Sequence, residues 1–238
     1  MFINSNNPTC AYVQFGSGSV RLDENLPFTI VGGATIQKPK LHTPFPPQTG
    51  AVPMSYPPPY QMPKVGCGST NAEVIGIDGS AMTPGNWDGD FPPEGVSRLE
   101  SGVYCIGGDF IVEGGNSLEG DGVTFVVKHD NIRFSGSATI KLTAPISEGI
   151  SYSGLLIYMP MGNKKTLTLN GNYASEFKGT ILAPSAHIQL NGMDNDDGFA
   201  SQIAGYTIEV KGMDIIRINY KDEHNFDTFR MPEVRLSQ

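Results

Sequence analysis

A short acidic loop is the part of this sequence whose residue types are best suited to binding a metal ion. Asp194, Asp196 and Asp197 lie within four consecutive positions and are followed by Gly198. Carboxylate oxygens crowded on a loop are ligands that Ca²⁺ prefers, but one short loop rarely supplies the six or seven that the ion needs. The segment also lacks the loop length and the terminal Glu of an EF-hand. It is a weak candidate calcium site, and a solvated turn is the alternative interpretation.

The single tryptophan is the residue best suited to stacking on a sugar. Trp87 lies in a glycine-rich loop beside the acids Asp88 and Asp90. An exposed indole ringed by acids could contact a glycan, whereas a lone Trp in such a loop more often pins the loop to the core. Trp87 is therefore a candidate ligand contact, with loop anchoring as the alternative.

The three cysteines, Cys10, Cys67 and Cys105, form no CxxC pair and have no histidine nearby in sequence, so zinc-site spacing is absent. One disulfide and one leftover thiol are arithmetically possible. We expect Cys67–Cys105, because each cysteine lies at the edge of a glycine-marked turn flanking the same irregular segment. Three reduced cysteines are the alternative, and the role of Cys10 is open.

No motif of a known catalytic class is found in the sequence. The histidines have no metal-ligand spacing, and no GxSxG, P-loop or helix-opening GxGxxG occurs. A polysaccharide lyase would need a carboxylate–metal site with a base on the same face, and a hydrolase would need two facing carboxylates. The sequence therefore predicts a protein that is not an enzyme and needs no cofactor, with a polysaccharide-acting β-helix enzyme as an alternative. The histidines are His42, His129, His187 and His224.

The composition narrows the classes of partner. The chain has 238 residues and a net charge of −8, and only 17 % of its residues are charged. Nucleic acid and anionic membrane surfaces both require a basic face, so neither is expected as a main partner. No apolar run approaches the roughly 20 residues of a membrane span. The start also lacks a signal peptide, so a secreted protein of this sequence is expected to be a fragment or a processed product.

A repeated pattern of apolar, any, apolar, any, glycine predicts the fold. Its glycines, at 114, 136, 171, 192 and 212, are 22, 35, 21 and 20 residues apart, which is a period of about 21 with one insertion. Each copy alternates like a half-buried strand and ends at a glycine corner. A second, more continuously apolar run between copies predicts a more fully buried strand. The copies are 110–114, 132–136, 167–171, 188–192 and 208–212, with a weaker one at 75–79, and the second runs are 122–127, 154–158 and 179–183.

These features favour an all-β, right-handed parallel β-helix, or β-solenoid, of about 21 residues per coil. An antiparallel sandwich is the alternative, but it would need short hairpins between strands adjacent in sequence. The solenoid places polar side chains of successive copies on its outer surface, where no pair of acids recurs. The predicted outward pairs are Ile111/Glu113, Arg133/Ser135, Thr168/Asn170, Gln189/Asn191 and Glu209/Lys211.

Four segments are expected along the chain. Residues 1–38 form N-terminal coils or a cap, and 39–66 form a proline-rich extended segment that cannot be a central strand. This segment is either a docking ligand or a rigid stretch crossing the outside of the solenoid. Residues 67–220 form the solenoid, and 221–238 form a C-terminal tail or cap.

The chain resembles a known group of bacterial proteins over most of its length, and best from about 100 to 220. The segments 101–110 (SGVYCIGGDF), 152–161 (YSGLLIYMPM), 178–184 (KGTILAP) and 201–206 (SQIAGY) are similar to segments of the Tad-type (tight adherence) pilus-associated, glycine-rich surface proteins. The resemblance implies an extracellular location at the bacterial cell surface and a role in pilus biogenesis or adhesion. It implies no catalytic residues, and the membrane helix with which such proteins typically begin has no counterpart here.

The leading functional hypothesis is a non-enzymatic, extracellular structural or adhesive surface module that self-associates into a homo-oligomer or filament. A carbohydrate-binding module that uses Trp87 on a surface glycan is the alternative.

Overall fold

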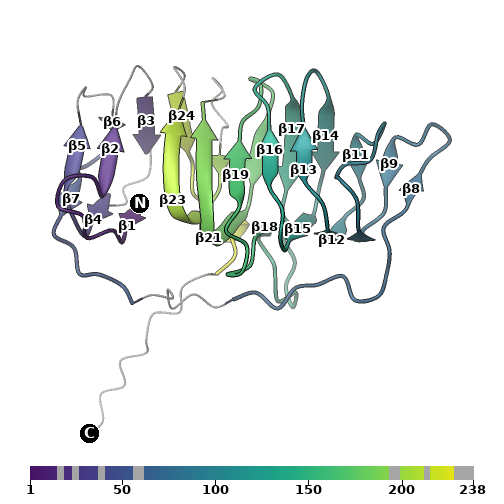
Figure 1. The fold of residues 1–238 in the computed structure, drawn as a ribbon, viewed down its shortest axis with the longest axis horizontal. Coiled ribbons are helices and arrows are strands. Elements are labelled where there is room, and N and C mark those ends of the chain that lie inside the picture. The colour runs from purple at the N-terminus through teal and green to yellow at the C-terminus, as the bar shows by residue number, and fades with distance from the viewer. Residues whose placement is uncertain are drawn as a thin grey trace, which may run out of the picture.

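The computed structural model describes residues 1–14, 19–22, 27–36, 41–55, 62–192, 199–211 and 215–227. They form a parallel β-solenoid of about eight turns with roughly 22 residues per turn (Figure 1). The one helical element described is the short 3₁₀ turn η1 (Asp222–His224). The predicted fold is confirmed, and the antiparallel sandwich is excluded because the strands pair in parallel, apart from one hairpin. The right-handed winding stays a prediction.

Each turn of the main solenoid contributes strands to three faces, which we call face 1, face 2 and face 3. Face 1 consists of β10 (Gly85–Trp87), β12 (Gly102–Ile106), β15 (Val123–Val127), β18 (Leu155–Tyr158) and the first halves of β21 (Thr180–Asn191) and β23 (Ile203–Lys211). Face 2 consists of β13 (Phe110–Val112), β16 (Ile132–Phe134), β19 (Thr166–Leu169) and the second halves of β21 and β23. Face 3 consists of β8 (Val74–Ile75), β9 (Ala81–Met82), β11 (Arg98–Leu99), β14 (Ser117–Gly120), β17 (Thr139–Thr143), β20 (Glu176–Lys178), β22 (Phe199–Ala200) and β24 (Ile215–Ile218).

The first residues of the chain lie at the far end of the stack (Figure 1). They form two further coils, which we call the N-terminal module, and their third strand pairs in parallel with β24, with Val20 beside Ile216. The coils that come first in sequence are therefore stacked after the last coil of the main solenoid. The strands of the module are β1 (Phe2–Ile3), β2 (Tyr12–Gln14), β3 (Ser19–Leu22), β4 (Thr29–Ile30), β5 (Ala34–Ile36), β6 (Leu41–His42) and β7 (Gln48–Thr49).

The segment that connects the module to the start of the main solenoid, residues 50–70, is called the strap, and its described parts, 50–55 and 62–70, lie along one side of the molecule (Figure 1). Asn4 exchanges two hydrogen bonds with the backbone of Met54, at 2.9 and 2.7 Å. Further along, the hydroxyl of Ser151 donates to the carbonyl of Lys64 at 3.2 Å. Of the segment 39–66, residues 41–42 and 48–49 form β6 and β7, so the extended stretch begins after the module. The triplet Pro57–Pro59 and its flanking tyrosines lie outside the described residues.

An aromatic stack fills the interior of the main solenoid, where inward-facing positions of successive coils carry phenylalanine. Phe91, Phe110, Phe134, Phe177 and Phe199 come from successive coils and are at most 1 % exposed. The ring centroids of neighbours in this stack are 4.9 to 5.8 Å apart. Rings at these distances contribute beyond the area that they bury, so the stack ties each coil to the next.

The central strands of face 1 are buried on both sides, which explains their continuously apolar sequences. All five residues of β15 are buried. Outside β18 and β21, the side chains of Leu155 and Leu182 form a second small core with Phe226 from the C-terminal segment and Val65 from the strap. The prediction of a more fully buried second strand is confirmed for the three runs at 122–127, 154–158 and 179–183.

Two segments differ from the sequence-based expectation. The weaker repeat copy at 75–79 belongs to the hairpin β8–β9, in which Val74 pairs antiparallel with Met82. The reason is a turn: Gly76 and Gly79 have positive φ, and Asp78 accepts hydrogen bonds from Ser80, so the chain reverses. The C-terminal tail or cap expected at 221–238 is described as far as residue 227 and covers the outer side of face 1 rather than an end of the solenoid, with Phe226 against Leu155 and Leu182.

Candidate functional site

The predicted calcium loop cannot be placed, because Asp194, Asp196 and Asp197 lie outside the described residues. Within the described ranges, no group of three or more His, Cys, Asp or Glu side chains could hold a metal ion. The calcium site stays a prediction.

Trp87 anchors its loop in the structure. The side chain is half-buried and packs against the main core. Its indole N–H donates to the carbonyl of Asp90 at 3.0 Å, across the corner that contains Gly89. With its donor engaged and part of its ring covered, Trp87 offers a smaller surface to a sugar than an exposed indole would. The geometry supports loop anchoring.

The disulfide between Cys67 and Cys105 is formed, as predicted, with the two Cα atoms 5.9 Å apart. It fixes the end of the strap to the outer side of β12. Cys10 is exposed and is not part of a disulfide. The cross-link closes a long loop of chain and holds the strap against face 1.

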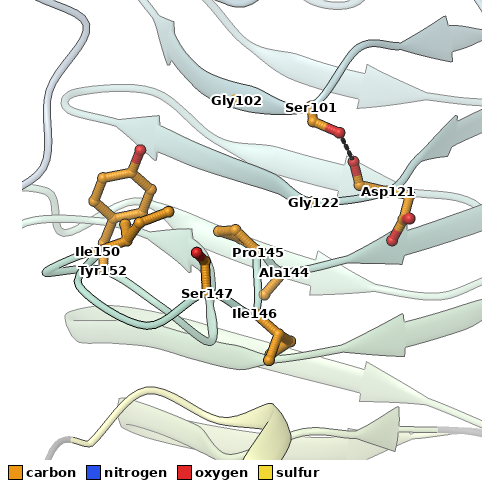
Figure 2. Close-up of a pocket in the computed structure, with 10 residues that line it drawn as sticks. All are labelled: Ser101, Gly102, Asp121, Gly122, Ala144, Pro145, Ile146, Ser147, Ile150 and Tyr152. Atoms are coloured by element: carbon orange, nitrogen blue, oxygen red, sulfur yellow. Dashed lines mark hydrogen bonds between the residues drawn. The ribbon is translucent and has the colours of Figure 1, made fainter.

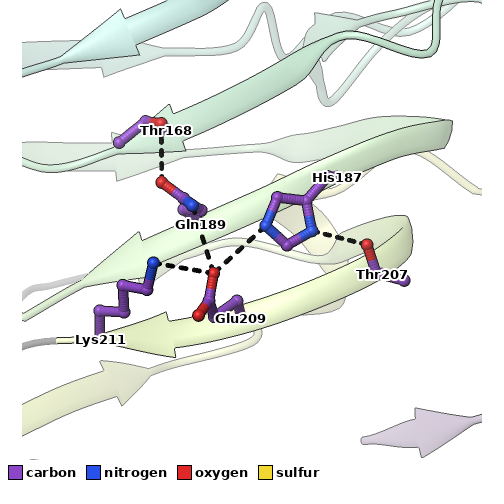
Figure 3. A network of polar contacts seen from close by, with 6 residues as sticks. All are labelled: Thr168, His187, Gln189, Thr207, Glu209 and Lys211. Carbon is purple, nitrogen blue, oxygen red and sulfur yellow. Dashed lines mark hydrogen bonds and ion pairs between the residues drawn. The ribbon is translucent and has the colours of Figure 1, made fainter.

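A flat polar ladder runs along the outside of face 2 (Figure 3). The register places Gln189 between Thr168 on one neighbouring strand and Glu209 on the other, and His187 beside Thr207. The Thr168 hydroxyl donates to the Gln189 side-chain carbonyl at 3.4 Å, and a His187 ring nitrogen lies 2.6 Å from the Thr207 hydroxyl. Side chains on three successive coils are thereby held in fixed positions on one surface.

Glu209 is the centre of this ladder. Its Oε2 atom lies 3.1 Å from Lys211 Nζ, 3.2 Å from Gln189 Nε2 and 3.3 Å from His187 Nε2. The hydrogen bond from Lys211 holds the pKa of the Glu209 carboxyl below its usual value; desolvation opposes this lowering, and the charge of Lys211 and the hydrogen bonds from His187 and Gln189 add to it. Glu209 is thus a stable anion that orders its neighbours and is poorly suited to proton transfer near neutral pH.

A second candidate surface is a pocket of about 490 Å³ beneath the insertion between β17 and β18 (Figure 2). Its floor is the corner between faces 3 and 1, where Ser101 and Asp121 lie on successive coils and the Ser101 hydroxyl donates to the Asp121 carbonyl at 2.7 Å. The Asp121 carboxylate accepts a hydrogen bond from the hydroxyl of Thr143. Pro145, Ile146, Ser147, Ile150 and Tyr152 from the insertion form its outer wall.

This pocket combines a polar floor with an apolar, partly aromatic wall. Such a combination suits a sugar ring, whose hydroxyls need hydrogen-bond partners and whose C–H faces pack on aromatic rings. Sequence reasoning noticed the insertion only as a break in the period. The signal for the insertion was the 35-residue spacing between repeat glycines, together with the strand-breaking residues Pro145, Gly149 and Gly154.

Sequence reasoning also missed a ladder of acids at the corner between faces 1 and 2. Asp90 Oδ1 accepts the backbone N–H of Asp109 at 3.2 Å, and Asp109 Oδ1 accepts that of Asn131 at 3.0 Å. A polar residue before the apolar start of each copy, as in Asp90-Phe91, Asp109-Phe110 and Asn131-Ile132, was the available signal. These carboxylates satisfy backbone groups of the next coil, which is a structural role.

No protein-family model, no curated protein and no solved structure matches this chain. Within the described residues, no helix has the length and apolar character that crossing a membrane requires.

Proposed function

We propose that this chain is a non-enzymatic structural and adhesive module of the bacterial cell surface, in which face 2 is the contact surface. The observation that carries the proposal is the ladder of Figure 3. Hydroxyl, amide, imidazole and carboxylate groups are held there on three successive coils by their own hydrogen bonds. Groups that are already ordered lose little conformational entropy on contact, so a flat polar surface of this kind binds polar polymers efficiently.

The extracellular location is supported by the disulfide, since disulfides persist mainly in oxidising compartments. The low content of charged residues and the resemblance to Tad-type pilus-associated proteins support a location at the cell surface. A solenoid tied together by an internal aromatic stack also suits a part that must keep its shape under mechanical load.

The proposal is tested by measuring how the purified chain adheres to whole bacteria and to bare glass or polystyrene. Gln189→Arg places a bulky cation in the middle of the ladder and is expected to reduce adhesion severalfold. Ser117→Arg adds the same side chain at an exposed position on face 3 and is the matched control. Equal adhesion of the two variants and the unmodified chain would reject face 2 as the contact surface.

Carbohydrate binding is a second candidate function, and the pocket of Figure 2 is the observation that favours it. On a glycan array, Tyr152→Ala should abolish the strongest signals, whereas Tyr173→Ala removes an exposed tyrosine outside the pocket and should leave them unchanged. Loss of the signals with Trp87→Ala alone would instead move the sugar site to the loop of Trp87.

The polysaccharide-acting enzyme is the remaining alternative. Incubation of the chain with a panel of acidic and neutral polysaccharides should release no reducing ends or unsaturated products. Turnover that Asp196→Ala abolishes would overturn the non-enzymatic assignment.

A further inference from the structure

The last coil of the main solenoid is incompletely covered. Ile208 and Val210 of β23 occupy the same inward positions as Ile188 and Leu190 of β21, with which they pair. In β21 these positions are 0 and 1 % exposed, but in β23 they are 46 and 38 % exposed. The apolar interior of the solenoid therefore reaches solvent at this end.

In the part of the chain that the structure describes, the N-terminal module pairs with this end along face 3. Within the described residues, β23 pairs with β21 and with no strand of the module, while β1 pairs with β4 and β2 pairs with β5. The module is joined to the main solenoid by the pairing of β3 with β24. Strand edges with unpaired N–H and C=O groups are templates for pairing with another strand.

The tether that carries the module is longer than its path requires. Neighbouring strands are about 4.8 Å apart, so the eight spacings from β6 to β9 along face 3 amount to roughly 38 Å. The strap from residue 50 to Cys67, where the disulfide fixes it to β12, can reach about 56 Å when extended. The module can therefore leave its own solenoid end and reach another without unfolding of the main solenoid.

The direction of the stack makes a second copy the fitting occupant. Along face 3 the main solenoid advances from β11 to β24, and the module advances from β3 to β6 in the same axial direction. If the module of a second copy paired with β24 of a first copy, the first main-solenoid coil of the second copy would be stacked next to that module, along the same axis. The coils of every copy would then be stacked in chain order.

We propose that the open end formed by β23 and β24 receives the N-terminal module of a second copy of this chain, which joins copies head to tail into a continuous solenoid. The arrangement described here, with β3 of the module on β24 of its own chain, is the closed form, in which Ile208 and Val210 of β23 stay partly exposed, whereas the junction between two copies covers them as well. Exchange of one element between identical chains through a long hinge is an established route to assembly, and a head-to-tail contact that does not close into a ring produces filaments.

The test uses two full-length variants in a Cys10→Ser background with the native disulfide intact. Arg21→Cys is on one chain and Arg217→Cys is on the other, because the two positions are register partners on β3 and β24. Neighbouring parallel strands bring Cα atoms within the range that a disulfide can bridge. In a mixture of the two variants under mild oxidation, a cross-link between positions 21 and 217 can form only between different chains.

The expected result is a dimer containing the 21–217 cross-linked peptide, identified by mass spectrometry, whose yield rises with protein concentration. Ile208→Lys with Val210→Lys in the chain bearing Arg217→Cys should reduce the yield about tenfold, since charges would enter the centre of the contact. Tyr173→Lys, a matched change at an exposed lateral position, should leave it unchanged.

The double variant Arg21→Cys/Arg217→Cys keeps the test decisive. If it cross-links within one chain while the mixture gives no 21–217 dimer at any concentration, the proposal is wrong and the closed form is the only one. If neither cross-links, β3 does not lie on β24 in any copy, and the proposal is also wrong. Adhesion of the oxidised, closed double variant measures the role of face 2 separately, so failure of one proposal leaves the other standing.

Discussion

The central coils of the main solenoid and the coils of the N-terminal module share one architecture but differ in how they are held. The central coils pair on three faces, enclose the phenylalanine stack and carry a disulfide. Among its described residues, the module has a core of three buried side chains, Tyr12, Phe28 and Ile30, and one strand pairing to the rest of the molecule.

The two regions also differ in how well their buried polar groups are hydrogen-bonded, and the module is again the less well held of the two. In the main core, the Tyr104 hydroxyl lies 2.9 Å from the Met82 carbonyl and 2.7 Å from that of Glu100. In the module, the Tyr12 hydroxyl donates to Gln14 Oε1 at 3.2 Å, but Gln14 Nε2 is buried without a partner among the described residues. Burial also raises the pKa of Tyr12 to about 12. In a stacked fold, stability is a sum over coils and their contacts, so we expect the module to open before the main solenoid.

The largest expected effect comes from removing one ring in each region. Phe110→Ala deletes a fully buried side chain that contacts Phe91, Phe125 and Phe134 and should lower the free energy of unfolding by about 3–5 kcal/mol. Phe28→Ala should unfold the module but leave the main transition unchanged. Chemical denaturation followed by circular dichroism distinguishes the two, and one shared transition shifted equally by both variants would contradict separate stabilities.

Loss of the disulfide should act on the main solenoid. Cys67→Ser/Cys105→Ser opens a loop with a sequence separation of 38 residues, which should cost about 2–4 kcal/mol. The strap should also detach from face 1 and become sensitive to limited proteolysis near Lys64. Unchanged thermal stability and unchanged cleavage would show that the strap is held by other contacts.

A smaller effect is expected from Gly154→Ala in the insertion. Gly154 has a φ of +76°, and an added Cβ would lie 2.3 Å from the carbonyl carbon of Asn225. The free energy of unfolding of the variant should fall by about 2 kcal/mol, and residues 222–227 should detach from face 1. Gly162→Ala, in a position where a Cβ meets nothing within 4 Å, is the control and should melt like the unmodified chain.

The smallest effect on stability is expected from Glu209, in the last coil of the main solenoid. The pKa of Glu209 is lowered in the folded state, chiefly by Lys211. The ionised Glu209 therefore contributes to the free energy of unfolding above its unfolded pKa, and this contribution is lost as the pH falls through its folded pKa. Because the pair is exposed, the change should be below about 1 kcal/mol. Glu209→Gln should flatten the acid side of the stability profile slightly, and an identical profile in both proteins would show that the network adds no stability.

The coils could be predicted from the sequence because their signals are local. Alternation with period two and a glycine at each corner recur in the five copies from 110 to 212. The predicted Cys67–Cys105 pairing was also correct, because these two cysteines flank one irregular segment. The hairpin at 75–79 carries the same residue pattern, and the turn at Asp78 decides against a coil there.

The remaining features depend on neighbours that are far apart in the chain. Ser19 pairs with Ile215, and no local pattern indicates that the first coils are stacked after the last. The Glu209 network forms because a coil of 20 to 22 residues places His187, Gln189 and Glu209 on adjacent strands, and so requires the register to be known. The pocket depends on how the insertion folds over Asp121, which its sequence does not specify.

Native-state hydrogen exchange tests most directly the claim that the module is a separately opening unit on a stable solenoid. Amides of β1, β2, β4 and β5 should exchange through a local opening of low free energy, while those of β13, β15 and β16 should exchange only through global unfolding. Equal protection of both sets, with the same dependence on denaturant, would contradict the account.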